Sequence, residues 1–218
     1  MKNIVLIGAT GFVGSAILKE ALNRGEQVTA ILRDPEKLNI QNKNLSVVKG
    51  DVMQTDRLAD LIKGNDVVIS AYNAGWANPD LYNDFIKASK SIQEAVKKSG
   101  VKRLIVIGGA GSLYIAPHLQ LVDTPEFPAE WKAGALAARD YLNILKKEDQ
   151  LDWTFLSPAI EMHHGTSGER KGVYRTGSDN PVFDAGKKSI ISVEDLAVAV
   201  IDEAEKPKHT RQRFTVAY

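Results

Sequence analysis

Three glycines at a spacing of three residues follow an apolar run in the sequence Ile4-Val5-Leu6-Ile7-Gly8-Ala9-Thr10-Gly11-Phe12-Val13-Gly14. The four apolar residues have the length of a strand that is buried on both faces. Apolar residues then recur at helical spacing from Phe12 to Leu22, so a helix is predicted directly after the second glycine. A strand, a glycine turn and a helix in this order predict a phosphate cradle, because the free amides at a helix N-terminus attract anions.

Each glycine of this turn has a separate predicted role. Gly8 allows the tight turn after the strand, Gly11 lets the backbone approach a pyrophosphate, and Gly14 allows close contact between helix and sheet. Glycines at this spacing also suit a simple turn with helix packing. The rest of the chain has to decide between these two interpretations.

Apolar runs of strand length alternate with helical patterns along the chain. The further runs lie at Val28 to Leu32, Leu45 to Val48, Val67 to Ile69, Leu104 to Ile107 and Phe214 to Val216. Helices are predicted between them, closed by Gly25 and Gly100, opened in one case by Asn78-Pro79, and present again at about Trp131 to Lys147. An S-x-x-D capping box at Ser192 to Asp195 opens the last helix.

This alternation predicts an α/β fold with a doubly wound parallel sheet, a Rossmann fold, in which ligands bind at the carboxyl ends of the strands. A length of 218 residues fits a single domain that spans residues 1–218. Two long stretches, about residues 109–129 and 157–188, follow strand ends and are predicted to form loops on the substrate side.

Composition excludes several classes of function. The 28 basic and 27 acidic residues leave a net charge of +1. We therefore expect the chain to bind neither nucleic acid nor an anionic membrane. The basic run from Lys206 to Arg213 follows three acidic residues and is interpreted as a solvated face. Cysteine is absent, which excludes disulfides, thiolate metal sites and a catalytic thiol, and fits a reducing cytoplasm. No apolar run approaches the roughly 18 residues of a membrane span, and the first run is too short for a signal peptide, so we expect a soluble, cytoplasmic protein.

Charged residues after the second and third predicted strands bear on the choice of cofactor. Arg33 ends the second strand, where an acidic residue would hold the ribose 2′-hydroxyl of NAD and an arginine would accommodate the 2′-phosphate of NADP. Asp34 next to it is either that NAD-binding acid or, with Pro35, the N-cap of a short helix. Asp51 after the third strand could hold an adenine amino group or serve as a turn residue.

The chain resembles the short-chain dehydrogenase/reductase superfamily, in its atypical NAD(P)H-binding branch of NADH-flavin reductase-like and NmrA-like regulator proteins. The resemblance rests on motifs along nearly the whole chain: residues 8–14, 28–33, 50–52, 65–71, 104–112, 152–158 and 192–197. It implies cofactor contacts from Thr10, Gly11, Phe12, Val13, Arg33, Asp51, Val52, Ala71 and Tyr72. It also implies that Gly108, Gly109, Pro158 and Ile160 lie beside the nicotinamide.

One feature of most members of this superfamily is absent from the chain. They carry a Tyr-x-x-x-Lys pair, in which the lysine lowers the pKa of a proton-donating tyrosine. The residues four positions after the tyrosines here are Trp76, Ile86, His118, Leu145 and Ser178. Reduction of a ketone needs a positioned acid, which is worth about 10²–10⁴-fold in rate. A flavin-like or quinone-like acceptor delocalises the incoming charge and mainly needs to be stacked on the nicotinamide.

Candidate residues on the acceptor side come from the two long loops. Ser112 and Tyr114 are the candidate catalytic residues, with a turn hydrogen bond for Ser112 and loop packing for Tyr114 as the alternatives. Glu161, His163 and His164 are further possible acceptor contacts. No metal site is predicted, because the two adjacent histidines lack further spaced ligands. Aromatic residues could line the pocket, although core packing is their commoner use; these are Trp76, Tyr82 and Trp131.

The sequence therefore predicts an NAD(P)H-dependent reductase that prefers NADPH over NADH and reduces a small flavin-like or quinone-like acceptor, with FMN or FAD as candidate substrates. A catalytically silent protein that senses NAD(P) and binds another protein is the first alternative. A sugar epimerase or dehydratase is the second, weakened by the missing Tyr-Lys pair. The fold alone does not choose among them, because function lies in the site. The sequence gives no prediction of the oligomeric state.

Overall fold

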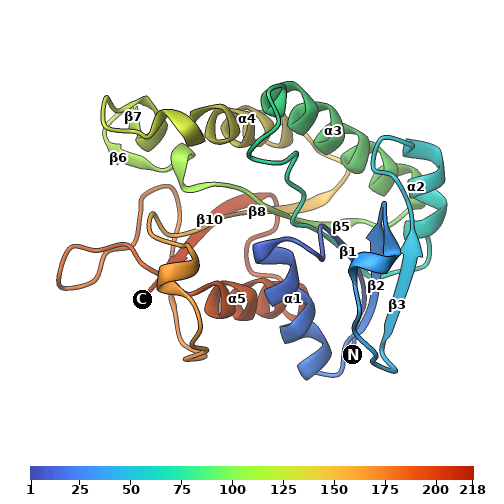
Figure 1. Cartoon of the computed structure of the whole chain (residues 1–218). Coiled ribbons are helices and arrows are strands. Elements are labelled where there is room, and N and C mark those ends of the chain that lie inside the picture. The colour runs from blue at the N-terminus through green and yellow to red at the C-terminus, as the bar shows by residue number, and fades with distance from the viewer.

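Eight strands form one sheet in the order β3-β2-β1-β4-β5-β8-β10-β9 in the computed structural model, which describes residues 1–218 (Figure 1). All neighbours pair in parallel except β10 and β9. The bounds are β1 Asn3–Ile7, β2 Gln27–Leu32, β3 Leu45–Lys49, β4 Val67–Ser70, β5 Arg103–Ile107, β8 Asp152–Ser157, β9 Arg175–Gly177 and β10 Gln212–Ala217. The strand order reverses between β1 and β4, which is where an open α/β sheet binds its ligand.

Helices cover both faces of this sheet. On one face α1 and α5 pack against the larger hydrophobic core, and on the other α2, α3 and α4 pack against a second core (Figure 1). The helices are α1 Phe12–Asn23, α2 Thr55–Ile62, α3 Leu81–Ser99, α4 Ala129–Leu145 and α5 Val193–Glu205. The central strands read as continuous apolar runs because both of their faces are buried. The predicted α/β fold with a doubly wound sheet is confirmed.

The strands predicted from apolar runs all form, within two residues at each end. The helix ends differ more. We predicted that Asn78-Pro79 opens a helix, but α3 begins at Leu81, because the Asn78 side chain accepts a hydrogen bond from the Asp80 amide in the preceding turn at 2.9 Å. Gly100 closes α3 with a left-handed φ of 83°, as expected. The Ser192 hydroxyl caps α5 by accepting from the Asp195 amide at 3.1 Å.

Short elements lie within the two long stretches on the substrate side. Residues 109–129 hold two 3-10 turns, η2 Ala110–Ser112 and η3 Leu121–Asp123, and a hairpin of β6 Tyr114–Ala116 with β7 Leu119–Gln120. Residues 157–188 hold η4 His164–Thr166 and β9. The two stretches touch, because the Tyr114 amide donates to the Asp179 carbonyl at 2.8 Å and the Asn180 side chain donates to the Tyr114 carbonyl at 2.7 Å.

The basic run at the start of β10 is only partly a solvated face. Lys206, Lys208 and Arg211 are exposed. Arg213 is buried, because β10 lies between β8 and β9 and is covered from this residue onward, and its guanidinium pairs with Asp179. His209 is half-buried and stacks on Phe214 with ring centroids 4.1 Å apart. None of the helices combines the length and apolar character that crossing a membrane requires.

Candidate functional site

The turn between β1 and α1 has a shape that glycines alone allow at two positions. Gly8 has a φ of 87°, and a Cβ atom there would lie 2.4 Å from the Ala71 carbonyl oxygen at the end of β4. A Cβ atom on Gly14 would lie 2.0 Å from the Gly8 carbonyl oxygen. The first and third glycines are therefore steric requirements of the turn and of its contact with β4.

Gly11 between them serves a different purpose. A Cβ atom at Gly11 would meet protein only at 3.4 Å, so the space beside this residue is open. Gly11 is the N-cap of α1 and has no side chain to cap it, and the amides of Phe12, Val13 and Gly14 donate to no protein acceptor. Thr10 beside them is exposed. Free amides next to open space fit the pyrophosphate of a dinucleotide.

Arg33 follows β2 at the same edge of the sheet. Its side chain is exposed and forms no ion pair or hydrogen bond within the protein. Tyr72, which follows β4, lies near this guanidinium. Burial raises the pKa of the Tyr72 phenol, and the positive charge of Arg33 opposes that rise. An unpaired guanidinium at this place has five free donors for a phosphate.

The two aspartates near Arg33 differ in their contacts. The Asp51 carboxylate accepts from the Met53 amide at 2.9 Å, which is a turn contact, and its second oxygen forms no hydrogen bond. Asp34 precedes the 3-10 turn η1 Pro35–Lys37 at the N-cap position, but its side chain makes no capping hydrogen bond. The position predicted for a cap is thus correct, whereas the capping contact is missing.

Two more predicted cofactor contacts lie beside the turn. The Val52 side chain is buried in the core under α2, so only its backbone faces the edge of the sheet. Ala71 is half-buried, and its carbonyl is the group against which Gly8 packs. The Val52 carbonyl already accepts from the Ser91 hydroxyl, and the Ala71 amide donates to the Ile7 carbonyl. Each residue therefore has one main-chain polar group left, and neither has a side chain that could form a polar contact.

The residues predicted beside the nicotinamide come together at the ends of β5 and β8. Gly108 lies against the Phe155 ring, where a Cβ atom would come within 2.0 Å, and its amide donates to the Leu156 carbonyl at 2.8 Å. Pro158 is buried and Ile160 is exposed. This part of the site consists of glycine backbone and apolar side chains.

Helix α4 presents alanines to this region. A Cβ atom on Gly109 would contact the Ala138 Cβ at 3.8 Å, and a Cβ atom on Gly111 would contact the Ala135 Cβ at 2.9 Å. Positions 135 and 138 are three residues apart and lie on one face of the helix. The face of α4 that packs against the end of β5 therefore carries no acid or base at these positions.

The pKa is raised above its ordinary value in five of the six tyrosines. Burial raises the pKa of Tyr72, Tyr141, Tyr174 and Tyr218, and the hydrogen bond from the Tyr82 phenol to Asp140, at 2.7 Å, is the main cause of the rise in its pKa. The remaining tyrosine is Tyr114 in β6, a half-buried residue whose phenol forms no hydrogen bond within the protein. Tyr114 is thus the phenol with a free hydroxyl on the acceptor side.

Ser112 has a different environment from Tyr114. It is 2% exposed, and both its hydroxyl and its carbonyl oxygen accept from the Arg213 guanidinium at 3.2 Å. This contact supports the structural alternative for Ser112, and its catalytic role stays a prediction. Arg213 and its partner Asp179 were not among the predicted site residues. The sequence does contain one signal for this pair, namely an arginine inside an apolar strand. A buried arginine is almost always paired with an acidic residue.

The three candidates after Pro158 lie on the outer part of the long loop. Glu161 pairs through its backbone with Ser189, and its side chain forms no hydrogen bond. His163 caps η4 by accepting from the Gly165 amide at 3.0 Å, and the His164 ring packs against Phe12 with centroids 4.3 Å apart. No group of three or more His, Cys, Asp or Glu residues converges on a point that could hold a metal.

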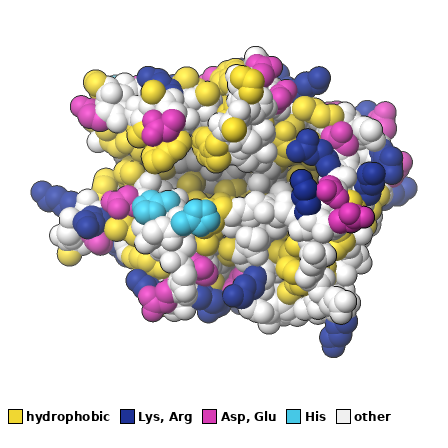
Figure 2. All heavy atoms as spheres, viewed as in Figure 1, with side chains coloured by type: hydrophobic (Ala, Val, Ile, Leu, Met, Phe, Trp, Pro, Cys, Tyr) yellow, Lys and Arg dark blue, Asp and Glu magenta, His cyan; other side chains and the backbone are white.

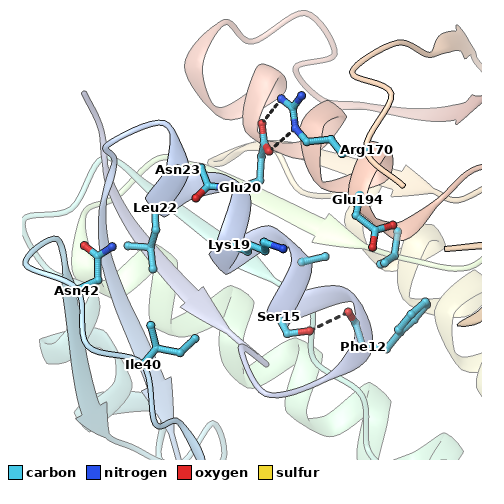
Figure 3. A pocket seen from close by; sticks show the side chains of 12 residues that line it. Phe12, Ser15, Lys19, Glu20, Leu22, Asn23, Ile40, Asn42, Arg170 and Glu194 are labelled. Carbon is cyan, nitrogen blue, oxygen red and sulfur yellow. Dashed lines mark hydrogen bonds and ion pairs between the residues drawn. The ribbon is translucent and has the colours of Figure 1, made fainter. Parts of the chain in front are cut away.

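The surface is hollowed between the layer of α3 and α4 and the layer of α1, and hydrophobic side chains border the hollow (Figure 2). A second groove runs along the outer face of α1, between Ile40 and Asn42 on one side and Arg170 and Glu194 on the other (Figure 3). Phe12 is its only residue among the predicted cofactor contacts. The hollow over the sheet edge, and not this groove, is the candidate active site.

Known proteins resemble the chain over nearly its full length. The sequence model of a family described as NAD(P)H-binding matches residues 8–207. The uncharacterized protein YwnB of Bacillus subtilis is 40% identical over 215 residues, which are 98% of this chain and 97% of that protein. A solved structure of a candidate epimerase from Bacteroides thetaiotaomicron is 50% identical, with a TM-score of 0.91 and coverage of 100% and 97% of the two chains. A candidate NADH-flavin reductase from Streptococcus pneumoniae is 34% identical, with a TM-score of 0.87 and coverage of 100% and 99%.

Proposed function

Because this chain belongs to the NAD(P)H-binding family, we propose that it is a reductase that uses NADPH and reduces a planar, conjugated acceptor of the flavin or quinone class. The observation that carries the proposal is the nature of the surface at the ends of β5 and β8. Glycine backbone, alanines of α4 and the buried Pro158 underlie it, and Ile160 is its exposed apolar side chain. Such a surface suits an acceptor that has to be stacked and does not need a strong acid.

The cofactor half of the proposal rests on the amides of α1 and on Arg33. Phe12, Val13 and Gly14 would donate to the pyrophosphate, and the absence of a side chain at Gly11 leaves room for it. Arg33 would bind the 2′-phosphate, which distinguishes NADPH from NADH. When bound, the nicotinamide supplies a hydride; the protein orients the ring and excludes water from it.

The relatives support a reductase without deciding the acceptor. The S. pneumoniae protein is a candidate flavin reductase, whereas the B. thetaiotaomicron protein is a candidate epimerase. An epimerase needs an acid and a base at the sugar carbon, and the β5 face of α4 provides neither at Ala135 and Ala138. We therefore rank the reductase first and a silent NADPH-sensing protein second.

A panel assay tests this function. Purified protein is mixed with NADPH and, in turn, FMN, FAD, riboflavin and menadione, and cofactor oxidation is followed at 340 nm against blanks without protein. The reductase predicts saturable turnover with at least one of these acceptors. Saturable NADPH binding by calorimetry, without turnover on any of them, would support the sensor instead.

A further inference from the structure

Trp76, in the segment between β4 and α3, is a large apolar side chain that the fold holds in an exposed position. The residue is 61% exposed, and its indole nitrogen donates to no protein acceptor. The outer edge of its six-membered ring nevertheless lies against α4, because a Cβ atom on Gly134 would lie 2.7 Å from Cζ3 and 3.2 Å from Cη2. One edge of the indole is thus anchored on α4 while most of the ring system remains open to solvent.

A glycine at position 134 is what makes this contact possible. Gly134 lies inside α4, where glycine costs about 1 kcal/mol relative to alanine. The same absent Cβ would also lie 3.3 Å from the Leu81 Cδ2 atom at the start of α3. Helix α4 therefore has a residue of low helix propensity at the position where the Trp76 ring lies against it.

The anchoring point is close to the predicted nicotinamide site. Gly134 and Ala138 are four residues apart, so they lie on the same face of α4, about 5–6 Å from each other. Ala138 is the residue that faces Gly109 after β5. The segment that carries Trp76 crosses from the end of β4 towards α3 and α4, on the side of the sheet edge where the hollow lies (Figures 1 and 2).

We propose that Trp76 is the platform on which the acceptor stacks, positioned by Gly134. The inference rests on the proposed function and narrows it, since an indole platform selects planar aromatic acceptors over sugars and aliphatic ketones. Stacking on one aromatic side chain contributes a factor of about ten in affinity for a flat heteroaromatic ring system. Trp76 is a binding residue in this scheme and takes no part in proton transfer.

The test measures the affinity of NADP⁺-loaded protein for FMN and for menadione by quenching of intrinsic fluorescence and by calorimetry. Trp76→Ala is expected to raise the dissociation constant about tenfold for the probe that the wild type binds, while the NADPH dissociation constant changes less than twofold. Val173→Ala is the matched control, because Val173 is 64% exposed but lies beside Gly172, which is bonded to α5. The control is expected to leave both constants unchanged.

Gly134→Ala separates stacking from a general loss of structure. The added methyl has to displace the Trp76 ring, so acceptor affinity should fall at least threefold, although alanine is the better helix residue and the melting temperature should hold or rise. Unchanged acceptor affinity in both Trp76→Ala and Gly134→Ala, in a protein that turns over the probe, would refute the platform and leave the reductase intact. Failure of the wild type to bind or reduce any probe would refute the reductase itself. A shift from dimer to monomer in Trp76→Ala, with unchanged acceptor affinity, would assign the ring to a subunit contact and refute the platform.

Discussion

Around β1, β2 and β4, the proposed cofactor half of the site is built on a turn of residues close in sequence, whereas the proposed acceptor half beyond β5 and β8 needs contacts between distant parts of the chain. Gly8, Gly11 and Gly14 form their turn by contacts within one heptapeptide and with the end of β4. On the acceptor side, Arg213 bonds to Ser112, which is 101 residues away in sequence, and Asn180 bonds to Tyr114, 66 residues away. The first half is thus a local motif, and the second is a product of the whole fold.

The largest loss of stability is expected at Gly8, where the glycine turn packs against the end of β4. Gly8→Ala combines a left-handed φ with a Cβ only 2.4 Å from the Ala71 carbonyl oxygen, and should lower the free energy of unfolding by about 3 kcal/mol in urea denaturation. Gly64→Ala is the control, because Gly64 has a similar φ of 81° with nothing within 4 Å, and should cost only about 1 kcal/mol. Equal costs for the two variants would contradict the steric account of the turn.

Gly11→Val should separate binding from folding within the same turn. The protein has room for the new side chain, so the free energy of unfolding should change by less than about 1 kcal/mol. The pyrophosphate would lose two charge-assisted hydrogen bonds, which predicts a rise of about 100-fold in the NADPH dissociation constant by calorimetry. Tight NADPH binding by this variant would place the cofactor elsewhere.

Arg213→Met should act on the acceptor half alone. Loss of the guanidinium removes its link between Ser112 and Asp179 and leaves the β6–β7 hairpin held to residues 179–180 only through Tyr114, so the KM for the acceptor should rise about tenfold in steady-state kinetics while NADPH affinity stays the same. Arg211→Met, two residues earlier and exposed, serves as the comparison. If NADPH affinity falls as much as acceptor affinity, the two halves are not independent.

Arg33→Ala should change cofactor choice without changing the fold. One charged hydrogen bond to the 2′-phosphate is worth about 1.5–3 kcal/mol, which predicts roughly tenfold or more weaker NADPH binding with NADH binding spared. Calorimetry with both cofactors distinguishes this result from general damage, which would weaken NADPH and NADH equally. In that case another phosphate contact would have to account for any NADPH preference.

Tyr114→Phe should give the smallest effect. The variant keeps the ring and removes only a hydroxyl that has no hydrogen-bond partner within the protein. If stacking dominates the reaction, kcat should fall less than about tenfold. A loss of roughly 10³-fold in kcat, with NADPH affinity unchanged, would establish Tyr114 as a proton donor and favour a carbonyl substrate.

The difference between local and long-range contacts also explains which parts of the structure could be predicted from the sequence. Strands buried on both faces and the glycine turn leave strong local signals, so β1, β2, β4 and β5 were placed within a residue. Helix α2 was missed because it has only eight residues, although Leu58 and Ile62 at a spacing of four mark its buried face. An apolar face marked only by Leu58 and Ile62 does not distinguish a short helix from a loop in the sequence.

The acceptor side was predicted less well because its contacts are not local. The sequence shows that Arg213 stands in a basic run, and only the fold shows that it faces Ser112 and Asp179. Trp76 was considered as a pocket residue without being assigned, because exposure of a tryptophan cannot be inferred from its neighbours in sequence. The missing side chain at Gly134, on α4, is what makes room for the edge of the indole.

The segment from Gly168 to Gly172 contains neither helix nor strand, yet helix side chains hold its backbone. The Gly168 amide donates to Glu194, and the amides of Lys171 and Gly172 donate to the buried carboxylate of Asp195 at 3.1 and 2.7 Å. Arg170 adds two hydrogen bonds to Glu20 of α1 (Figure 3). Deuterium can therefore replace the amide protons of Lys171 and Gly172 only when their hydrogen bonds to Asp195 break. These two amides of an irregular segment should therefore exchange with deuterium as slowly as hydrogen-bonded amides of a helix do.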